Sequence, residues 1–259
     1  WIFFSHRLRF WSLRQDETGS VECTYKMRLL SYLGVVLAIA IGITFGSFLW
    51  YKSIFHQFFS TMYGVWYFAG SVWLTIATVY TITAALKATG PLKDVATDKT
   101  FYFLGSLFFA FTVFYAYITF SQYFIIWNAN IPEETFWYLL REEGSWYGLS
   151  MVIIFDHFFF PFLMLLRIDW KLKPMVIIPL AAWAWLMHYL DMHFNVMPGL
   201  HKEGFHLAFV DIGLFLLIGG FLTKQFLVTL HSAPVYPQRD PRIAEAMDVS
   251  YVAPAAATG

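Results

Sequence analysis

Carboxyl and imidazole groups occur together in two long apolar stretches of this chain. The run IIFDHFFFP carries Asp156 next to His157 at its centre, and WAWLMHYLDMHFN carries His188 and Asp191 three residues apart. Residues i and i+3 share one face of a helix, so the second pair can exchange a proton near neutral pH. Pro161 lacks the N–H that would bond the carbonyl of His157, which loosens the turn beside the first pair and can admit water. These four residues are candidates for proton transfer.

Further polar residues extend this candidate pathway. Asp211 lies about two turns inside the last apolar stretch, and Ser71 and Thr75 belong to a line of hydroxyl groups at helical spacing. Gln122 lies near the end of another apolar stretch, and we expect it to bond across to the His188 region. We predict a proton pathway through Asp156, His157, His188, Asp191 and Asp211, with Ser71, Thr75 and Gln122 as candidate relay residues.

Each of these residues also has a structural interpretation. An ionisable group near the centre of a membrane helix costs ~2.5–3.5 kcal/mol on insertion scales, so it needs a partner, water or a function. Acids and imidazoles in such helices commonly hydrogen-bond between helices, and Ser or Thr commonly bonds the carbonyl four residues earlier. A solvated vestibule without chemistry would show the same skew of charged residues toward one leaflet. The residue pattern alone leaves these alternatives open.

Residue types and spacing argue against a metal or cofactor bound by this chain. A b-type haem needs two His at similar depth on facing helices, whereas His157 and His188 differ in depth by roughly 6–7 Å at 1.5 Å per residue. The single cysteine, Cys23, can form neither an internal disulfide nor a cysteine metal site. The sequence has no HExxH, P-loop or GxGxxG motif. We therefore expect no metal, haem or iron–sulfur cluster in this chain.

The elements that position these residues are apolar helices. Of 259 residues, 59% are hydrophobic and 13% are charged, against about a quarter charged in soluble domains. A bilayer core needs about 20 apolar residues per helix, and backbone groups in lipid must be satisfied within the segment. The sequence therefore predicts an all-α integral membrane protein with six transmembrane helices, over 29–49, 62–86, 101–127, 146–166, 174–194 and 205–223.

The regions outside these spans give the domain organisation. Residues 1–28 are expected to hold the end of a preceding span and a loop, residues 29–230 the six-helix region, and residues 231–259 an extended, Pro- and Ala-rich tail. Fourteen of the 17 Lys and Arg residues fall before the first span, in alternate connections or in the tail. By the positive-inside rule those segments, including both ends of the chain, are cytoplasmic and loop 128–145 faces outward. The formal net charge is zero, so no basic surface attracts nucleic acid.

The outward loop changes character abruptly, in FSQYFIIWNANIPEETFWYL over residues 120–139. Asn130 and Glu133 have the spacing of a helix N-cap and its reciprocal acid, and Pro132 suits the first turn. The aromatic residues that follow are typical of a short helix lying along the membrane surface. We expect Glu133 and Glu134 to face outward, where an extrinsic partner can dock.

The same stretch carries a family resemblance. FSQY at 120–123, followed by Trp127, Asn130 and the run PEET at 132–135, resembles the ActF subunits of bacterial alternative complex III, which are NrfD-like integral membrane subunits. SLFFAFTVFYAYITFSQY over 106–123 and GPLKDV over 90–95 are also similar, and the resemblance covers nearly the whole chain. Members of this family have about ten spans in two four-helix bundles with a flanking helix at each end, so the six spans are expected to be the last six.

The resemblance implies a function in electron transport in the bacterial cytoplasmic (inner) membrane. Alternative complex III is a quinol:electron acceptor oxidoreductase. The family implies partners: a paralogous NrfD-like quinol-binding subunit, an iron–sulfur subunit, multihaem and monohaem cytochrome c subunits, and lipids. The haem c and iron–sulfur clusters belong to those partners, while quinone or menaquinone is associated with this subunit type. The bundle in which the paralogue holds its quinol is absent here, so no quinol-contact residue is carried over.

We therefore expect a membrane subunit without redox centres that acts as a scaffold and conducts protons. A secondary transporter or channel would use the same intramembrane acids as a substrate site, and Pro161 and Pro179 are weak indications of broken helices. A purely structural membrane anchor is a third interpretation.

Overall fold

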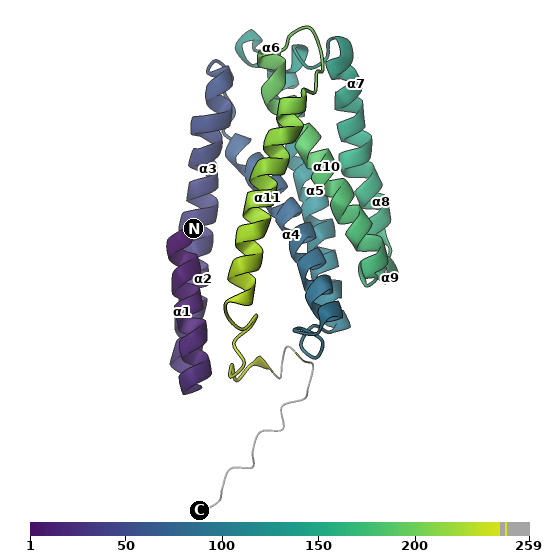
Figure 1. Cartoon of the computed structure of the whole chain (residues 1–259). Helices are drawn as coiled ribbons and strands as arrows, with labels where there is room; N and C mark the ends of the chain where they lie inside the picture. The colour runs from purple at the N-terminus through teal and green to yellow at the C-terminus, as the bar shows by residue number, and fades with distance from the viewer. Residues whose placement is uncertain (244–246, 248–259) are drawn as a thin grey trace, which may run out of the picture.

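The structure is a computed structural model that describes residues 1–243 and residue 247. In this part of the chain every regular element is a helix (Figure 1). Six helical stretches are long and apolar enough to cross a membrane, which confirms the predicted all-α membrane fold. They run Val21–Phe55, Tyr63–Thr89, Asp98–Ala129, Gly144–Leu166, Pro174–Gly199 and Phe209–His231.

Several of these stretches contain more than one helical element. The first comprises α2 (Val21–Leu33), η1 (Gly34–Ile41), α3 (Gly42–Gly46), η2 (Ser47–Tyr51) and η3 (Lys52–Phe55). The second is α4 (Tyr63–Thr89) and the third is α5 (Asp98–Ala129). The fourth comprises α7 (Gly144–Val152), η4 (Ile153–Phe159) and α8 (Phe160–Leu166). The fifth comprises α10 (Pro174–Val196) and η5 (Met197–Gly199), and the sixth is α11 (Phe209–His231).

Four of the six stretches form the packed centre, namely α4, α5, α7–α8 and α10. In the most apolar window of the second and the fifth stretch 39% of the residues are buried, against none in the first and sixth. The stretch from α2 to η3 and helix α11 therefore lie at the periphery of the bundle; Figure 1 shows their courses. Their side chains remain largely exposed.

The bundle has two ends. One carries α6 (Pro132–Leu139) and the start of α7, and the other carries α9 (Ile168–Lys171) and the residues after α11 (Figure 1). We call them the α6 end and the α9 end. The connection between α4 and α5 and the one between α8 and α10 both fall at the α9 end, and together they contain four Lys and Arg residues.

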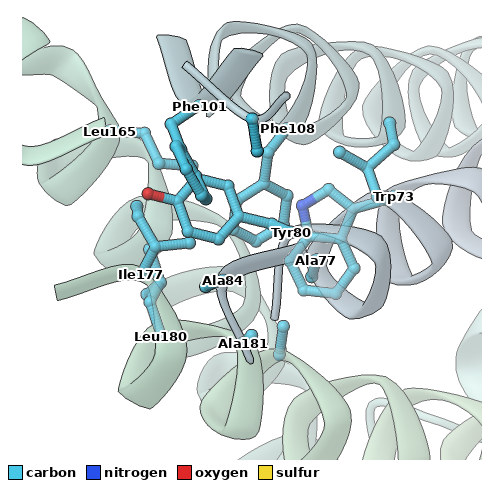
Figure 2. Packing of buried hydrophobic residues seen from close by; sticks show 13 residues of the cluster. Trp73, Ala77, Tyr80, Ala84, Phe101, Phe108, Leu165, Ile177, Leu180 and Ala181 are labelled. Carbon is cyan, nitrogen blue, oxygen red and sulfur yellow. The ribbon is translucent and has the colours of Figure 1, made fainter. Parts of the chain in front are cut away.

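Each end has its own hydrophobic core. The α9-end core (Figure 2) consists of Trp73, Ile76, Ala77, Tyr80, Ala84, Ala96, Phe101, Phe108, Leu165, Ile177, Leu180, Ala181 and Ala184. The α6-end core consists of Phe58, Tyr63, Trp66, Ala69, Tyr115, Ile118, Ile126 and Trp137. Ala side chains on α4 and α10 allow these two helices to approach closely in the α9-end core, which is how small residues act in membrane bundles.

The first 28 residues differ from the expected end of a span and loop. They form α1 (Ile2–Thr18) and the beginning of α2, because residues 2–18 contain neither Gly nor Pro to interrupt a helix. Gly19 ends α1 in the left-handed conformation, with φ of 64°, and Ser20 caps α2 by accepting a hydrogen bond from the N–H of Glu22.

Helix α1 contacts the residues that follow α11. Arg9 donates to the hydroxyl of Ser232 at 2.6 Å, and Gln15 donates to the carbonyl of Arg239 at 3.2 Å. Of the expected tail over 231–259, His231 ends α11 and residues 232–243 contain turns. The rest of the predicted tail, apart from residue 247, lies outside the described residues.

The connection between α5 and α6 corrects one detail of the prediction. Asn130 does not cap α6. It ends α5 in the left-handed conformation, with φ of 49°, because α5 continues to Ala129 and Asn tolerates this backbone geometry. Pro132 does open α6, with Glu133 and Glu134 in the first turn. Trp137 is buried rather than interfacial, and it stacks on Phe58 with ring centroids 4.9 Å apart.

Candidate proton-transfer site

His157 lies at the centre of the bundle, on the π-helical segment η4. This wider winding comes just before Pro161, whose missing N–H frees the carbonyl of His157. The imidazole is 2% exposed, stacks on Trp73 with ring centroids 4.3 Å apart, and lies 4.7 Å from the ring of Tyr115. Among the described residues its Nε2 has no hydrogen-bond partner. His157 is thus a buried imidazole with one nitrogen available for a proton.

Asp191 is the centre of a hydrogen-bonded group beside this imidazole. Tyr115 donates its hydroxyl hydrogen to Asp191 Oδ2, and Asn195 donates from Nδ2 to Asp191 Oδ1 at 3.3 Å. His188 Nδ1 lies 3.9 Å from Asp191 Oδ2 and has no hydrogen-bond partner in the described part of the chain. The predicted pairing of His188 with Asp191 on one face of α10 is therefore present, slightly beyond hydrogen-bond distance.

The two predicted pairs meet in one place. The rings of His157 and His188 are 5.9 Å apart, centroid to centroid, although they come from different spans. We call Tyr115, His157, His188 and Asp191 the buried cluster; α5, η4 and α10 supply its members, and all four are buried. The structure therefore joins proton-bearing groups from three spans.

The expected difference in depth between His157 and His188 is wrong. The fifth stretch continues to Gly199 rather than ending at residue 194, which places His188 eleven residues from its α6 end. His157 lies thirteen residues from Gly144, where the fourth stretch begins. At 1.5 Å per residue these depths differ by only ~3 Å, so the two imidazoles can meet.

Gly70 allows the cluster to pack against α4. A Cβ atom at this position would lie 2.7 Å from Cε1 of His188 and 3.1 Å from Cε2 of Tyr115. Any side chain at residue 70 would therefore displace two members of the cluster. The glycine is required here because only a residue without a side chain allows this close approach. Its presence inside a helix lowers stability by ~1 kcal/mol relative to Ala.

Two equivalent indole–threonine hydrogen bonds bracket the cluster. Trp66 Nε1 donates to Thr119 Oγ1 at 2.9 Å on the α6 side, and Trp73 Nε1 donates to Thr112 Oγ1 at 2.8 Å on the α9 side. Residues 66 and 73 on α4 and residues 112 and 119 on α5 are each seven apart, which is two turns of a helix. These bonds fix the register of α4 against α5, and hence the position of Tyr115 between them.

Three members of the cluster also offer metal ligands. One ligand atom each from His157, His188 and Asp191 lies within 4.8 Å of the others, and zinc accepts such a donor set. In a tetrahedral zinc site with bonds of ~2.1 Å the ligand atoms are ~3.4 Å apart, closer than the 3.9 Å between His188 Nδ1 and Asp191 Oδ2. The hydroxyl of Tyr115 also donates a hydrogen bond to this Asp191 Oδ2. As arranged, the His188 and Asp191 donor atoms are spread more widely than the ligands of a tetrahedral zinc site.

The two other predicted acids lie apart from the cluster. Asp156 is half-buried, and its carbonyl accepts a hydrogen bond from Trp183 Nε1 at 3.0 Å. Adjacent helical residues point about 100° apart, so the side chain of Asp156 points away from the cluster when that of His157 points toward it. Asp211 lies in the first turn of α11, where its Oδ2 accepts from the N–H of Ala208 at 3.0 Å. Because the sixth span begins at Phe209, Asp211 caps a helix at its end and is not two turns inside.

Of the three candidate relay residues, Thr75 and Gln122 bond away from the cluster, and Ser71 contributes its carbonyl to the bond from Thr75. Thr75 is exposed and donates to the carbonyl of Ser71 at 2.7 Å, which is the structural interpretation of such hydroxyl groups. Gln122 is buried, but it accepts from Ser60 at 2.9 Å and lies 3.4 Å from the hydroxyl of Tyr138. The expected bond from Gln122 to the His188 region is therefore absent, because its helix position turns it toward α6.

The remaining predicted residues lie on the surface of the α6 end. Glu133 is exposed and Glu134 half-exposed, in the first turn of α6. Carboxylates there complement the positive end of the helix dipole. Their role in docking a partner stays a prediction.

Sequence reasoning missed three residues that complete the site. Tyr115 looked like one aromatic residue among many, and Asn195 like the end of a span. A signal existed for Asn195: it follows Asp191 by four residues and therefore shares its helix face. Nothing in the sequence pattern distinguished Arg141, a basic residue between α6 and α7, as buried.

Arg141 joins the end of α6 to the end of α10. Its guanidinium donates to the carbonyls of Trp137 at 2.6 Å, Phe194 at 3.1 Å and Asn195 at 2.8 Å. Only 2% of the residue is exposed, and burial lowers its pKa to about 9. The group therefore stays charged at neutral pH. A cation near the C-terminal end of α10 is favoured by the helix dipole, and it fixes the residue that bonds Asp191.

Comparison of the chain with protein-family models finds no matching family, and comparison with curated proteins finds no match.

Proposed function

We propose that this chain is the membrane subunit of a quinol:electron acceptor oxidoreductase of the alternative complex III kind, with a proton-handling role. Two observations support the proposal. The motif over 120–135 resembles the ActF subunits of that complex, and the buried cluster gathers four proton-bearing side chains in the middle of the bundle. The buried cluster is the observation that supports the proton-handling role.

The cluster can pass a proton without a redox centre of its own. Asp191 Oδ2 lies 3.9 Å from His188 Nδ1, and the ring centroids of His188 and His157 are 5.9 Å apart. Small side-chain movements bring these atoms to hydrogen-bond distance, the geometry that proton transfer requires. Tyr115 and Asn195 hold the carboxylate in place while the proton moves. Partner subunits with haem c and iron–sulfur clusters carry the electrons from a quinol such as menaquinol.

The periphery of the bundle suits a subunit of a larger membrane complex. The first and sixth spans have no buried residue in their most apolar windows, so they can pack against lipids or a paralogous NrfD-like subunit. Glu133 and Glu134 on α6 offer an acidic surface to an extrinsic cytochrome or iron–sulfur subunit. In this proposal the α6 end faces outward from the bacterial cytoplasmic membrane and the basic α9 end faces the cytoplasm.

The test is the Asp191→Asn variant in the assembled complex. Quinol-driven proton release and turnover are measured in sealed vesicles, with Asp94→Asn as the control because Asp94 is exposed in the α4–α5 connection. We expect at least a tenfold loss of proton-coupled turnover for Asp191→Asn, in the usual range for a positioned acid or base, and none for the control. Unchanged proton stoichiometry and turnover would rule out a role for the cluster.

Copurification separates this proposal from the other two functions. A stable complex with cytochrome and iron–sulfur subunits supports it. Transport catalysed by the isolated chain would indicate a transporter or channel. Loss of assembly in the Asp191→Asn variant, without any change in the turnover of the fraction that does assemble, would indicate an anchor.

A further inference from the structure

We infer that the buried cluster exchanges protons with the α6 end of the bundle only, and that the α9-end core closes it on the other side. The inference rests on the proposed function in one respect, namely that the cluster carries protons. The asymmetry itself comes from the packing on the two sides of the cluster.

The path toward the α9 end is apolar. From His188 to the start of α10 at Pro174 there are fourteen residues, or ~21 Å at 1.5 Å per residue, and from His157 to the end of α8 at Leu166 there are nine, or ~13.5 Å. The thirteen residues of the α9-end core fill this side, and Figure 2 shows their side chains interleaved. A proton crossing a region of this kind would need water or polar groups, because an isolated charge is very costly in an apolar interior.

The polar atoms within the α9-end core are already bonded. Its side chains carry two, the indole nitrogen of Trp73 and the hydroxyl of Tyr80. Trp73 donates to Thr112 and Tyr80 donates to the carbonyl of Lys171 at 2.9 Å. Neither side chain is left with a free donor to continue a hydrogen-bonded chain from the cluster. In the described part of the chain, two buried hydroxyls at this end, of Thr97 and Ser106, have no hydrogen-bond partner, but two isolated hydroxyls do not form a continuous chain to the cluster. This side therefore acts as a seal.

The path toward the α6 end is polar. Asp191 lies eight residues from Gly199, where the fifth stretch ends, or ~12 Å along the helix. Asn195 donates to Asp191, and its own carbonyl accepts from the buried guanidinium of Arg141. The buried Oδ1 of Asn195 has no partner in the described part of the chain, so it offers an acceptor for an incoming water.

A second row of polar groups lies in the same half of the bundle. Ser60 bonds Gln122, Gln122 lies beside the hydroxyl of Tyr138, and Trp66 bonds Thr119. The α6-end core itself contains four Tyr or Trp residues, each with a polar edge. Side chains of this kind can rearrange around water, as buried polar sites generally do. The cluster is accordingly open to one end through polar side chains and closed at the other.

Access of water can be measured with a matched pair of cysteine variants. Ala69 and Ala77 lie on the same helix, both fully buried, on opposite sides of the cluster. Ala69→Cys and Ala77→Cys are made in a Cys23→Ala background, which removes the one native thiol. The complex is reconstituted in sealed vesicles, and a membrane-impermeant methanethiosulfonate reagent is added from one side at a time.

We expect the thiol of Ala69→Cys to react at least about tenfold faster from the α6 side than the thiol of Ala77→Cys reacts from either side, since local opening governs access. Comparable rates for the two variants, reaction of Ala77→Cys from the α9 side, or failure of Ala69→Cys to react would each overturn the inference. If either variant does not fold, Thr119→Cys and Thr112→Cys replace the pair, because both threonines accept an indole N–H. The assay measures access and not turnover, so its failure is separate from failure of the proposed function.

Discussion

The contact between Gly70 and the buried cluster gives the sharpest test of the site geometry. In Gly70→Ala the new Cβ would start 2.7 Å from His188 Cε1 and 3.1 Å from Tyr115 Cε2. Carbon atoms in good contact are about 3.5–4.0 Å apart. His188 must therefore retreat by ~0.8 Å or more and the ring of Tyr115 by ~0.4 Å.

The cost follows from these displacements. Forcing an extra carbon into a packed interior costs ~1–3 kcal/mol, while replacing Gly by Ala inside a helix gains ~1 kcal/mol. Gly148→Ala is the matched control, because Gly148 is an exposed helical residue with no atom within 4 Å of its Cβ position. The control keeps the helix gain without the clash. We expect Gly70→Ala to be less stable than Gly148→Ala by about 2 kcal/mol, or roughly 4–8 °C in melting temperature.

Thermal unfolding in detergent measures the stability difference, and quinol-driven turnover of the assembled complex measures the functional effect. Turnover should fall in Gly70→Ala, because His188 and Tyr115 both move relative to Asp191, and it should be unchanged in Gly148→Ala. If Gly70→Ala melts at or above the control and turns over normally, then the close packing of α4 against the cluster is not what positions it.

Two further predictions concern groups that the sequence pattern did not reveal. Tyr115→Phe removes the hydroxyl that bonds Asp191, so we expect the free energy of unfolding to fall by ~1–3 kcal/mol and turnover to decrease. The control Tyr117→Phe, at a residue 63% exposed, should change neither. Equal melting temperatures of the two variants would contradict this prediction. Burial lowers the pKa of Arg141 to about 9, while the unfolded residue keeps its ordinary, higher value, so above pH 9 the unfolded chain binds more protons and the free energy of unfolding rises with pH. Between pH 8 and pH 10 the wild type should therefore gain stability relative to Arg141→Met, as measured by denaturant unfolding in detergent, and parallel pH profiles would show that the guanidinium does not titrate there.

The six spans were readable from the sequence because their signal is local. Each run of about 20 apolar residues must form a helix in lipid whatever its neighbours do. The bounds differed at polar ends, such as the start of the sixth span, where Gly204 has a positive φ and residues 204–208 stay outside a helix before α11 begins at Phe209. For the same reason Asp211 was placed inside a span although it caps one.

The membership of the site was only half readable. His188 and Asp191 share a helix face, so spacing alone identified them as a pair. The contact of His157 with His188 depends on how two different spans pack, and no spacing within either span reports it. Asp156 and His157 are equally prominent in the sequence, and the rotation of η4 decides that the imidazole faces the bundle interior.

The sequence by itself determined that this chain is a set of apolar helices carrying a few ionisable groups at their centres, since composition and run length act through local physics. Only the tertiary structure decided which of those groups meet. It brought together His157, His188 and Asp191 with Tyr115, and it buried Arg141 between two helix ends. The physical reason is that burial and proton-transfer distance are properties of contacts between helices, and these are set by packing details such as the missing side chain at Gly70.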